Sequence, residues 1–161
     1  MIRARVITCS DAASAGQRED RSGPAVRDLL AARGYDVGNV TVVPDDVDAI
    51  SRAIVEAADA VPLVVTTGGT GIALRDVTPE ATMRVCERVI PGFGELMRAV
   101  SLQKTPMAAL SRAQAATRGT ALVINLPGSP RAAVENLEAV LQLIPHAVDL
   151  LAGKTEHKSE R

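Results

Sequence analysis

The sequence predicts an α/β fold of three layers, in which helices cover both faces of a parallel sheet. Short apolar segments rich in β-branched residues alternate along the chain with helical patterns, as is typical of such sheets. Each apolar segment is short enough for a strand, and residues that commonly begin or end helices punctuate the chain between these segments. In sheets of this kind, ligands bind beyond the carboxyl ends of the strands.

Composition favours a single domain and argues against several kinds of partner. The chain has 161 residues, enough to bury a substantial core, and we expect one domain over 1–153 with a polar tail at 154–161. Aromatic residues make up only 1%, which argues against nucleic-acid binding by base stacking. Because 18 Lys and Arg nearly balance 19 Asp and Glu, we expect no broad charged surface for nucleic acid or membrane.

The cysteines and the N-terminus predict a protein of the cytoplasm. Cys9 and Cys86 lie far apart and lack the spacing of a zinc site or a disulfide framework, so we expect reduced thiols. Residues 1–11 contain no signal-peptide pattern, and no apolar run approaches the length of a membrane span.

Strands and helices are expected in alternation. The apolar patterns predict strands at 2–9, 36–43, 63–67 and 120–125. Helical patterns occupy 22–34, 45–58, 78–89, 91–102 and 129–151, and Pro145 should interrupt the last one. We expect a loop at 11–21, whereas 104–118 is compatible with helix or irregular structure.

Three serine or threonine residues are expected to cap helix N-termini. Ser22, Thr78 and Ser129 each stand shortly before a proline that suits the first helical turn. Acidic residues at 45, 46 and 48 begin another helix, where the helix dipole alone could explain some of them.

The segment 63–80 (LVVTTGGTGIALRDVTPE) is the most informative part of the chain. Three glycines, Gly68, Gly69 and Gly71, follow the predicted strand and bring backbone N–H groups close to a ligand. The connection to the next helix is about ten residues, against a usual median of about 4 to 6. It matches neither standard nucleotide fingerprint. Arg75 and Asp76 in this loop strengthen the signal for a binding site, but from these residues alone a glycine turn with a solvated ion pair is an almost equal alternative.

Four loops should converge on one rim of the sheet, because they leave the carboxyl ends of predicted strands. These loops cover 10–23, 44–46, 68–78 and 125–129. The rim would carry three carboxylates, Asp20, Asp45 and Asp76, beside helix N-termini that suit anions. Since carboxylates repel phosphate unless a cation lies between them, we expect Mg²⁺. A turn role for Asp20 and a dipole role for Asp45 remain alternatives.

The sequence shows no catalytic pair of nucleophile and base. His146 falls on the last predicted helix, His157 falls in the tail, and Cys9 is best interpreted as a packed thiol. A phosphate that attacks another phosphorus centre is already anionic and needs positioning and charge neutralisation instead of a base. The residues therefore favour phosphoryl or nucleotidyl transfer over hydrolytic acyl chemistry.

Four segments in order along the chain carry a family resemblance: 66–82 (TTGGTGIALRDVTPEAT), 91–95 (PGFGE), Ser111-Arg112 and 125–130 (NLPGSP). Together they resemble the molybdopterin adenylyltransferases of molybdenum cofactor biosynthesis, the MogA-like proteins related to MoaB and to the G domains of the plant enzyme and of gephyrin.

The resemblance implies an α/β fold, usually a homotrimer, that transfers AMP from ATP to the terminal phosphate of molybdopterin with Mg²⁺ and releases pyrophosphate. It also implies that Asp45 and Asp76 serve catalysis and the metal, and that Ser129 contacts an anionic group of the ligand. Other proteins of cofactor biosynthesis are further expected partners. The remaining expected binding positions are Ser22, Gly23, Gly68, Gly69, Thr70, Gly71, Pro127 and Gly128, with Asp20, Ser111 and Arg112 as additional candidates.

Two other classes of function stay open at this point. A non-catalytic carrier of molybdopterin would share the pocket without needing both Asp45 and Asp76. A scaffold would need fused partner domains, and the short polar ends of the chain suggest none. Some MoaB-like relatives lack the RD-x-TPE pattern, and its presence at 75–80 favours the enzyme.

Overall fold

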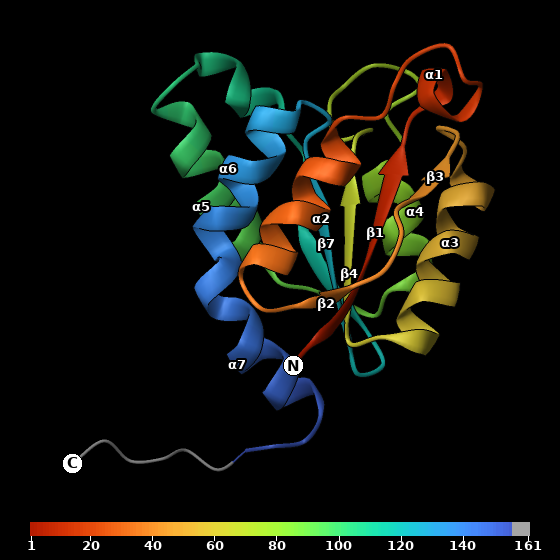
Figure 1. Cartoon of the computed structure of the whole chain (residues 1–161). Coiled ribbons are helices and arrows are strands. Elements are labelled where there is room, and N and C mark those ends of the chain that lie inside the picture. Colours follow the sequence, from red (N-terminus) through yellow and green to blue (C-terminus); the bar gives the residue numbers. More distant parts are fainter. Residues whose placement is uncertain (156–161) are drawn as a thin grey trace.

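The computed structural model describes residues 1–155 and has three layers, with a seven-stranded sheet between two layers of helices (Figure 1). The strands are β1 (Arg3–Cys9), β2 (Asp36–Val37), β3 (Thr41–Val43), β4 (Leu63–Thr67), β5 (Arg88–Val89), β6 (Ala115–Arg118) and β7 (Ala121–Leu126). The helices are α1 (Asp11–Ser14), α2 (Ser22–Ala32), α3 (Val47–Ala60), α4 (Thr78–Val85), α5 (Pro91–Leu102), α6 (Pro130–Val140) and α7 (Ile144–Leu151), with 3-10 turns η1 (Pro106–Leu110) and η2 (Leu141–Leu143). The predicted α/β class with helices on both faces is confirmed.

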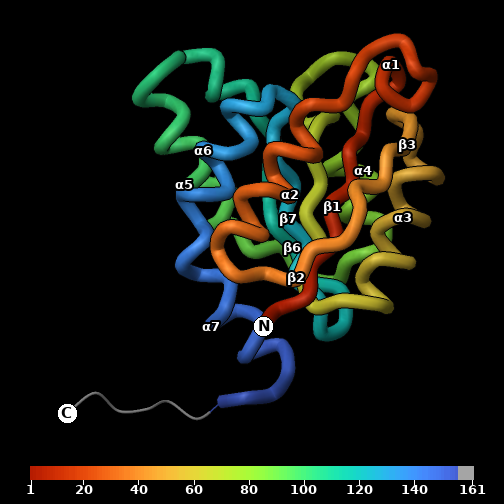
Figure 2. Tube along the Cα trace, viewed as in Figure 1, coloured from red at the N-terminus to blue at the C-terminus, as the bar shows by residue number. Residues whose placement is uncertain are grey.

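Helices α3 and α4 cover one face of the sheet, and α2, α5, α6 and α7 cover the other (Figure 2). Side chains of the central strand β4 alternate between the two layers: Leu63 and Val65 pack toward α2, α5 and α6, whereas Val64 packs toward α3. All five residues of β4 are buried. A strand buried on both faces needs the uninterrupted apolar and β-branched pattern that predicted it.

The sheet is parallel at its centre and antiparallel at one edge. β1 pairs in parallel with β2, β3 and β4, and β4 pairs in parallel with β7. β6 runs antiparallel to both β7 and β5, so the expectation of a wholly parallel sheet was wrong there. The reason is local, because only Gly119 and Thr120 separate β6 from β7, and so short a connection makes a hairpin.

Three predicted elements differ from the structure. The strand expected at 36–43 is split into β2 and β3, because the stretch from Asp36 to Thr41 lies opposite Arg3 to Ile7 and is one residue longer. The loop expected at 11–21 begins with helix α1. The helix expected to reach residue 89 ends at Val85, and the next strand, β5, pairs with β6.

Of the three predicted caps, only Ser129 is confirmed, since its hydroxyl accepts a hydrogen bond from the N–H of Ala132 at 3.4 Å. Ser22 and Thr78 are instead the first residues of their helices, and neither caps one. The Ser22 hydroxyl bonds that of Thr67 at 2.7 Å, and the Thr78 hydroxyl donates to the carbonyl of Gly68 at 2.9 Å. Both hydroxyls therefore form tertiary hydrogen bonds instead of capping a helix.

The C-terminal helix is interrupted as predicted. Helix α6 ends at Val140, a 3-10 turn follows, and Pro145 lies in the first turn of α7. Most of the predicted tail at 154–161, His157 included, lies outside the described residues. Within 1–155, no helix is both long and apolar enough to span a membrane.

A buried polar network joins the central strands to α4. The Asn125 side-chain amide donates to the hydroxyls of Thr66 and Thr82, at 3.0 Å each, and the Thr82 hydroxyl donates to the carbonyl of Thr78 at 2.8 Å. All four residues are buried. Because Thr78 also holds Gly68, this network fixes both ends of the loop between β4 and α4.

We expect Asn125→Ala to lower the free energy of unfolding by about 2 kcal/mol, because it leaves buried hydroxyls without their donor. Urea denaturation measures this change. Asn39→Ala, at an exposed asparagine, is the control and should stay within about 0.5 kcal/mol of the wild type. Equal stability of the two variants would contradict a stabilising role for the network.

Candidate functional site

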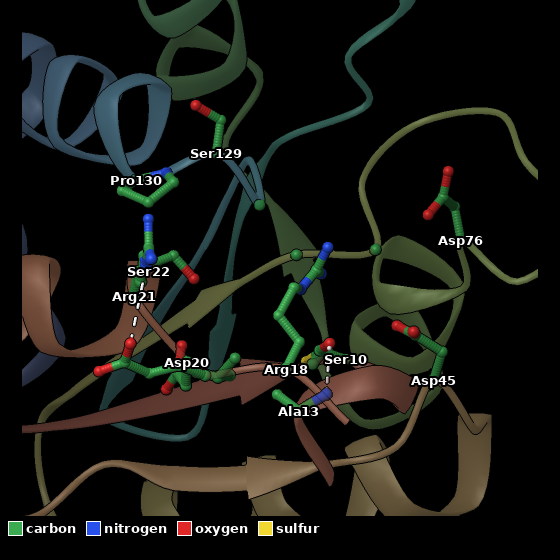
Figure 3. Close-up of a pocket in the computed structure, with 16 residues that line it drawn as sticks. Ser10, Ala13, Arg18, Asp20, Arg21, Ser22, Asp45, Asp76, Ser129 and Pro130 are labelled. Atoms are coloured by element: carbon green, nitrogen blue, oxygen red, sulfur yellow. Dashed lines mark hydrogen bonds and ion pairs between the residues drawn. The ribbon is translucent and has the colours of Figure 1, made fainter. Parts of the chain in front are cut away.

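A cleft of about 640 Å³ opens at the carboxyl ends of the central strands (Figure 3). All four loops that were expected to converge contribute to it, so the predicted rim is confirmed. The lining residues are Thr8, Cys9, Ser10, Ala13, Arg18, Glu19, Asp20, Arg21, Ser22, Asp45, Gly68, Gly69, Asp76, Gly128, Ser129 and Pro130.

The loop between β4 and α4, residues 68–77, forms one wall of the cleft, and we call it the glycine loop. Gly68 and Gly69 have φ angles of 91° and 69°, which L side chains rarely adopt. A Cβ on Gly68 would lie 2.3 Å from the carbonyl oxygen of Cys9, and one on Gly69 would lie 2.3 Å from the Thr78 hydroxyl. Both positions therefore require glycine.

Asp45 is held by backbone on one oxygen and left without a protein partner on the other. Its Oδ2 accepts a hydrogen bond from the N–H of Asp11 at 3.0 Å, whereas its Oδ1 is buried and unpartnered. Burial is the main cause that raises the pKa of Asp45; the bond from Asp11 opposes it, and repulsion by Asp11 and Asp76 adds to it. A buried carboxylate oxygen without a donor is suited to a bound cation.

Asp76 lies on the glycine loop on the same side of the cleft as Asp45 (Figure 3). Its Oδ2 accepts a bond from the N–H of Ala73 at 3.0 Å, within the same loop. Arg75, the preceding residue, pairs with Asp11 at 2.9 Å and not with Asp76. The alternative of an ion pair within the loop was therefore wrong, and Asp76 has no cationic partner among the described side chains.

Asp20, Ser22 and Gly23 support the opposite wall. Asp20 accepts from the N–H of Gly23 at 3.1 Å and from the Thr8 hydroxyl at 2.8 Å, so it fixes the start of α2. Asp20 and Ser22 line the cleft, whereas Gly23 is buried behind it and does not. A turn role for Asp20 thus agrees with its contacts.

Gly128 and Ser129 complete the cleft where α6 begins. A Cβ on Gly128 would lie 3.3 Å from the Cα of Gly68, so the two loops are in close backbone contact. Ser129 is exposed at the N-terminus of α6, where backbone donors and the helix dipole favour an anion.

Four of the predicted binding residues line a second cavity instead: Thr70, Gly71, Ser111 and Pro127. This cavity measures about 350 Å³ and lies between the glycine loop, α5, η1 and α6. The glycine loop therefore contributes Gly68 and Gly69 to one cavity and its next two residues to the other.

Arg112 lines neither cavity and holds the glycine loop. Its Nε donates to the carbonyl of Gly71 at 2.8 Å and its Nη2 to the carbonyl of Asp76 at 2.8 Å. The guanidinium also pairs with Glu80, and the N–H of Arg112 donates to the carbonyl of Thr70 at 2.7 Å. Arg112 is therefore a clamp on the loop backbone.

Sequence reasoning missed Ser10 and Arg18, which line the cleft, and Asp11, which bonds Asp45. Ser10 caps α1, accepting from the N–H of Ala13 at 3.1 Å, and Asp11 bonds the backbone of Asp45. Arg18 extends into the space between Ser129 and the carboxylates (Figure 3) and forms no ion pair with a described residue. Asp11 is the second residue after a strand, which was the available signal; nothing local in the sequence marks Arg18.

Cys9 is a packed thiol, as expected. It is 3% exposed, and burial raises its pKa to about 12, which keeps it protonated at neutral pH. Burial is also the main reason that the pKa of Cys86 rises to about 11.

Asp45 and Asp76 fit a magnesium ion that is held partly by substrate. Among the described residues, no group of three or more His, Cys, Asp or Glu side chains could hold a metal alone. Mg²⁺ commonly binds through one or two carboxylates plus substrate phosphates, and the unpartnered Oδ1 of Asp45 offers one such ligand.

Comparison with known proteins identifies the family. Residues 5–146 match the model of a family described as a probable molybdopterin binding domain. The chain belongs to this molybdopterin-binding family. Two relatives are named molybdopterin adenylyltransferase. The one from Helicobacter pylori J99 is 45% identical over an alignment that covers 99% of this chain and 93% of the relative. The one from Escherichia coli K12 is 37% identical over 94% of this chain and 86% of the relative.

Solved structures of molybdopterin biosynthesis proteins have the same fold. The molybdopterin biosynthesis enzyme MoaB from Thermus thermophilus is 47% identical and superposes with a TM-score of 0.89, over 96% of this chain and 98% of its own. The molybdopterin biosynthesis Mog protein from Mycobacterium ulcerans is 35% identical and superposes with a TM-score of 0.88, over 94% of this chain and 99% of its own.

We expect Arg112→Lys to loosen the glycine loop, because a lysine cannot donate in a planar fork to two carbonyls at once. Backbone amides of 70–76 should exchange with solvent faster, by about tenfold, while the global unfolding midpoint changes little. Hydrogen exchange with mass spectrometry measures both. Arg118→Lys is the matched control, since Arg118 donates to the carbonyl of Val85, outside the loop. Unchanged exchange at 70–76 would argue against the clamp.

Proposed function

We propose that this protein is a molybdopterin adenylyltransferase, which transfers AMP from ATP to the terminal phosphate of molybdopterin and releases pyrophosphate. The relatives at 37–45% identity bear that name. The observation that carries the proposal is the pair of carboxylates, Asp45 and Asp76, in a cleft that suits phosphates. A carrier of molybdopterin would have no need of this pair.

Two cavities separated by one loop support a reaction of two substrates. The larger cleft offers helix N-termini and Arg18, which suit the phosphates of ATP, and carboxylates that could hold a cation against those phosphates. The second cavity is lined by apolar side chains of η1 together with Ser111, which suits a flat pterin ring. Because both cavities include residues of the glycine loop, the phosphates of the two substrates would meet beside it.

The protein groups supply position and charge. Attack by a phosphate needs no general base, which agrees with a cleft whose lining among residues 1–155 contains no histidine and whose cysteine stays protonated. Ser129 and the N-terminus of α6 would bind an anionic group, and Arg18 would neutralise charge on the leaving pyrophosphate. Asp45 and Asp76 would hold Mg²⁺, which, when bound, neutralises the charge on the reacting phosphates.

We further infer that the protein assembles as a homotrimer. The family resemblance supports this state, and so do exposed apolar side chains on α5 and η1, namely Leu96, Leu102, Met107 and Leu110. Light scattering on the purified protein gives the mass that tests it.

The proposed reaction is tested by incubating the protein with molybdopterin, ATP and Mg²⁺. Mass spectrometry should detect adenylylated molybdopterin and pyrophosphate in equal amounts. Binding of molybdopterin without formation of this product would reject the enzyme in favour of a carrier.

Asp76→Asn tests the metal role, because it keeps the size of the side chain and an acceptor for the Ala73 N–H while removing the charge. We expect adenylyl transfer to fall by roughly a hundredfold or more, as expected when metal stabilisation of several kcal/mol is lost. The thermal midpoint and molybdopterin affinity should stay close to wild type. Near-normal turnover of the well-folded variant at moderate Mg²⁺ would exclude a metal role for Asp76.

Ser129→Asp tests the anion site at the start of α6. Aspartate also caps helices and suits the dipole, so folding should be little affected. Its charge should repel the terminal phosphate of molybdopterin, which would reach the main cleft beside Ser129, and weaken molybdopterin binding by at least about tenfold, measured by fluorescence titration. An unchanged affinity would remove Ser129 from the site.

A further inference from the structure

Asp11 and Arg75 join the two segments that carry the cleft carboxylates. Arg75 Nε donates to Asp11 Oδ2 at 2.9 Å, and Arg75 Nη2 donates to Asp11 Oδ1 at 3.0 Å. Asp11 in turn exchanges two hydrogen bonds with Asp45: its N–H donates to Asp45 Oδ2, and its Oδ1 accepts from the Asp45 N–H, both at 3.0 Å. Asp11 therefore lies between Arg75 and Asp45.

The position of Asp76 depends on contacts that anchor the glycine loop to the rest of the protein. Asp76 belongs to a ten-residue connection, and its own side chain bonds only Ala73 within that connection. Of the described residues outside the loop, Arg112 binds the carbonyl of Gly71 beside the second cavity and the carbonyl of Asp76 itself. On the side that faces Asp45, Arg75 is the loop residue whose side chain bonds the segment 10–46, and its partner there is Asp11. Arg112 thus holds the Asp76 backbone, and the Arg75–Asp11 pair fixes the neighbouring residue on the side that faces Asp45.

We propose that the Asp11–Arg75 pair sets the position of Asp76 relative to Asp45, so that both carboxylates reach one metal ion. Asp11 and Arg75 are then positioning residues that touch neither substrate nor metal. This inference rests on the metal role of Asp45 and Asp76 in the proposed function.

The exposure of the Asp11–Arg75 pair distinguishes a positioning role from a role in stabilising the fold. The Arg75 and Asp11 side chains are 67% and 44% exposed. Water screens exposed ion pairs, which therefore contribute little to stability, so breaking this pair should leave the fold intact. Residues behind metal ligands, by contrast, commonly change metal affinity by about 10–100-fold.

The variants follow from the contacts. Arg75→Gln removes the cation, and Asp11→Asn removes the charge while its amide oxygen can still accept from the Asp45 N–H. The double variant tests whether the two residues act through each other. Arg84→Gln is the matched control, because it breaks the exposed Asp48–Arg84 pair between α3 and α4, away from the cleft.

The direct readout is metal binding without turnover. Mn²⁺ replaces Mg²⁺, ATP is present, molybdopterin is absent, and electron paramagnetic resonance measures free Mn²⁺. We expect each single variant to bind Mn²⁺ about tenfold more weakly than wild type, the double variant to match the singles, and the control to match wild type. Thermal midpoints should agree within about 2 °C, and in the transfer assay high Mg²⁺ should restore most of the rate.

Three outcomes would overturn the proposal. Unchanged Mn²⁺ affinity in both single variants would exclude a positioning role, and additive losses in the double variant would show that the residues act separately. A raised KM for ATP in Arg75→Gln, without any effect of Asp11→Asn, would make Arg75 a substrate contact. Asp76→Asn in the same binding assay separates failure of this proposal from failure of the proposed function. If Asp76→Asn loses Mn²⁺ binding while the Asp11 and Arg75 variants keep it, only the positioning role fails. If Asp76→Asn binds Mn²⁺ normally, the metal role of Asp76 fails as well.

Discussion

The close backbone contact at Gly68 is the constraint on which the site depends. Its N–H donates to the carbonyl of Leu126 at 3.0 Å, and a Cβ there would lie 2.3 Å from the carbonyl oxygen of Cys9. The ends of β1, β4 and β7 therefore meet through backbone atoms, with no room for a side chain between them. Because three loops leave the sheet at this one point, their side chains line a common cleft, and its wall contains backbone donors that can approach a phosphate.

The same cleft contains a group that the fold alone does not satisfy. Asp45 Oδ1 is buried without a partner, and Asp11 and Asp76 add negative charge beside it. An unpaired buried carboxylate oxygen costs stability, so its presence in a well-packed domain is best explained by a ligand that arrives later. A cation bridging phosphates would offset both the lost hydration and the repulsion.

The sequence predicted those features that local pattern determines. The apolar run of β4, the ten-residue glycine loop and the convergence of loops at strand ends follow from periodicity and from the geometry of parallel sheets. The caps at Ser22 and Thr78 were wrong because tertiary partners, Thr67 and the Gly68 carbonyl, bind these hydroxyls. The pairing of Asp11 with Arg75 joins residues 64 positions apart, and no local pattern encodes such a contact.

Two arginines hold the glycine loop from opposite sides, and they do so by different chemistry. Arg112 donates to two backbone carbonyls of the loop, those of Gly71 and Asp76, whereas Arg75 binds the carboxylate of Asp11. Between these anchors the tip of the loop is free of the core, with Leu74 98% exposed. A loop fixed at both cavities can keep two substrates in register, because any shift of its backbone would move residues of both sites together. Catalysis by positioning requires this kind of coupling, since the reacting phosphates must be aligned without help from a base.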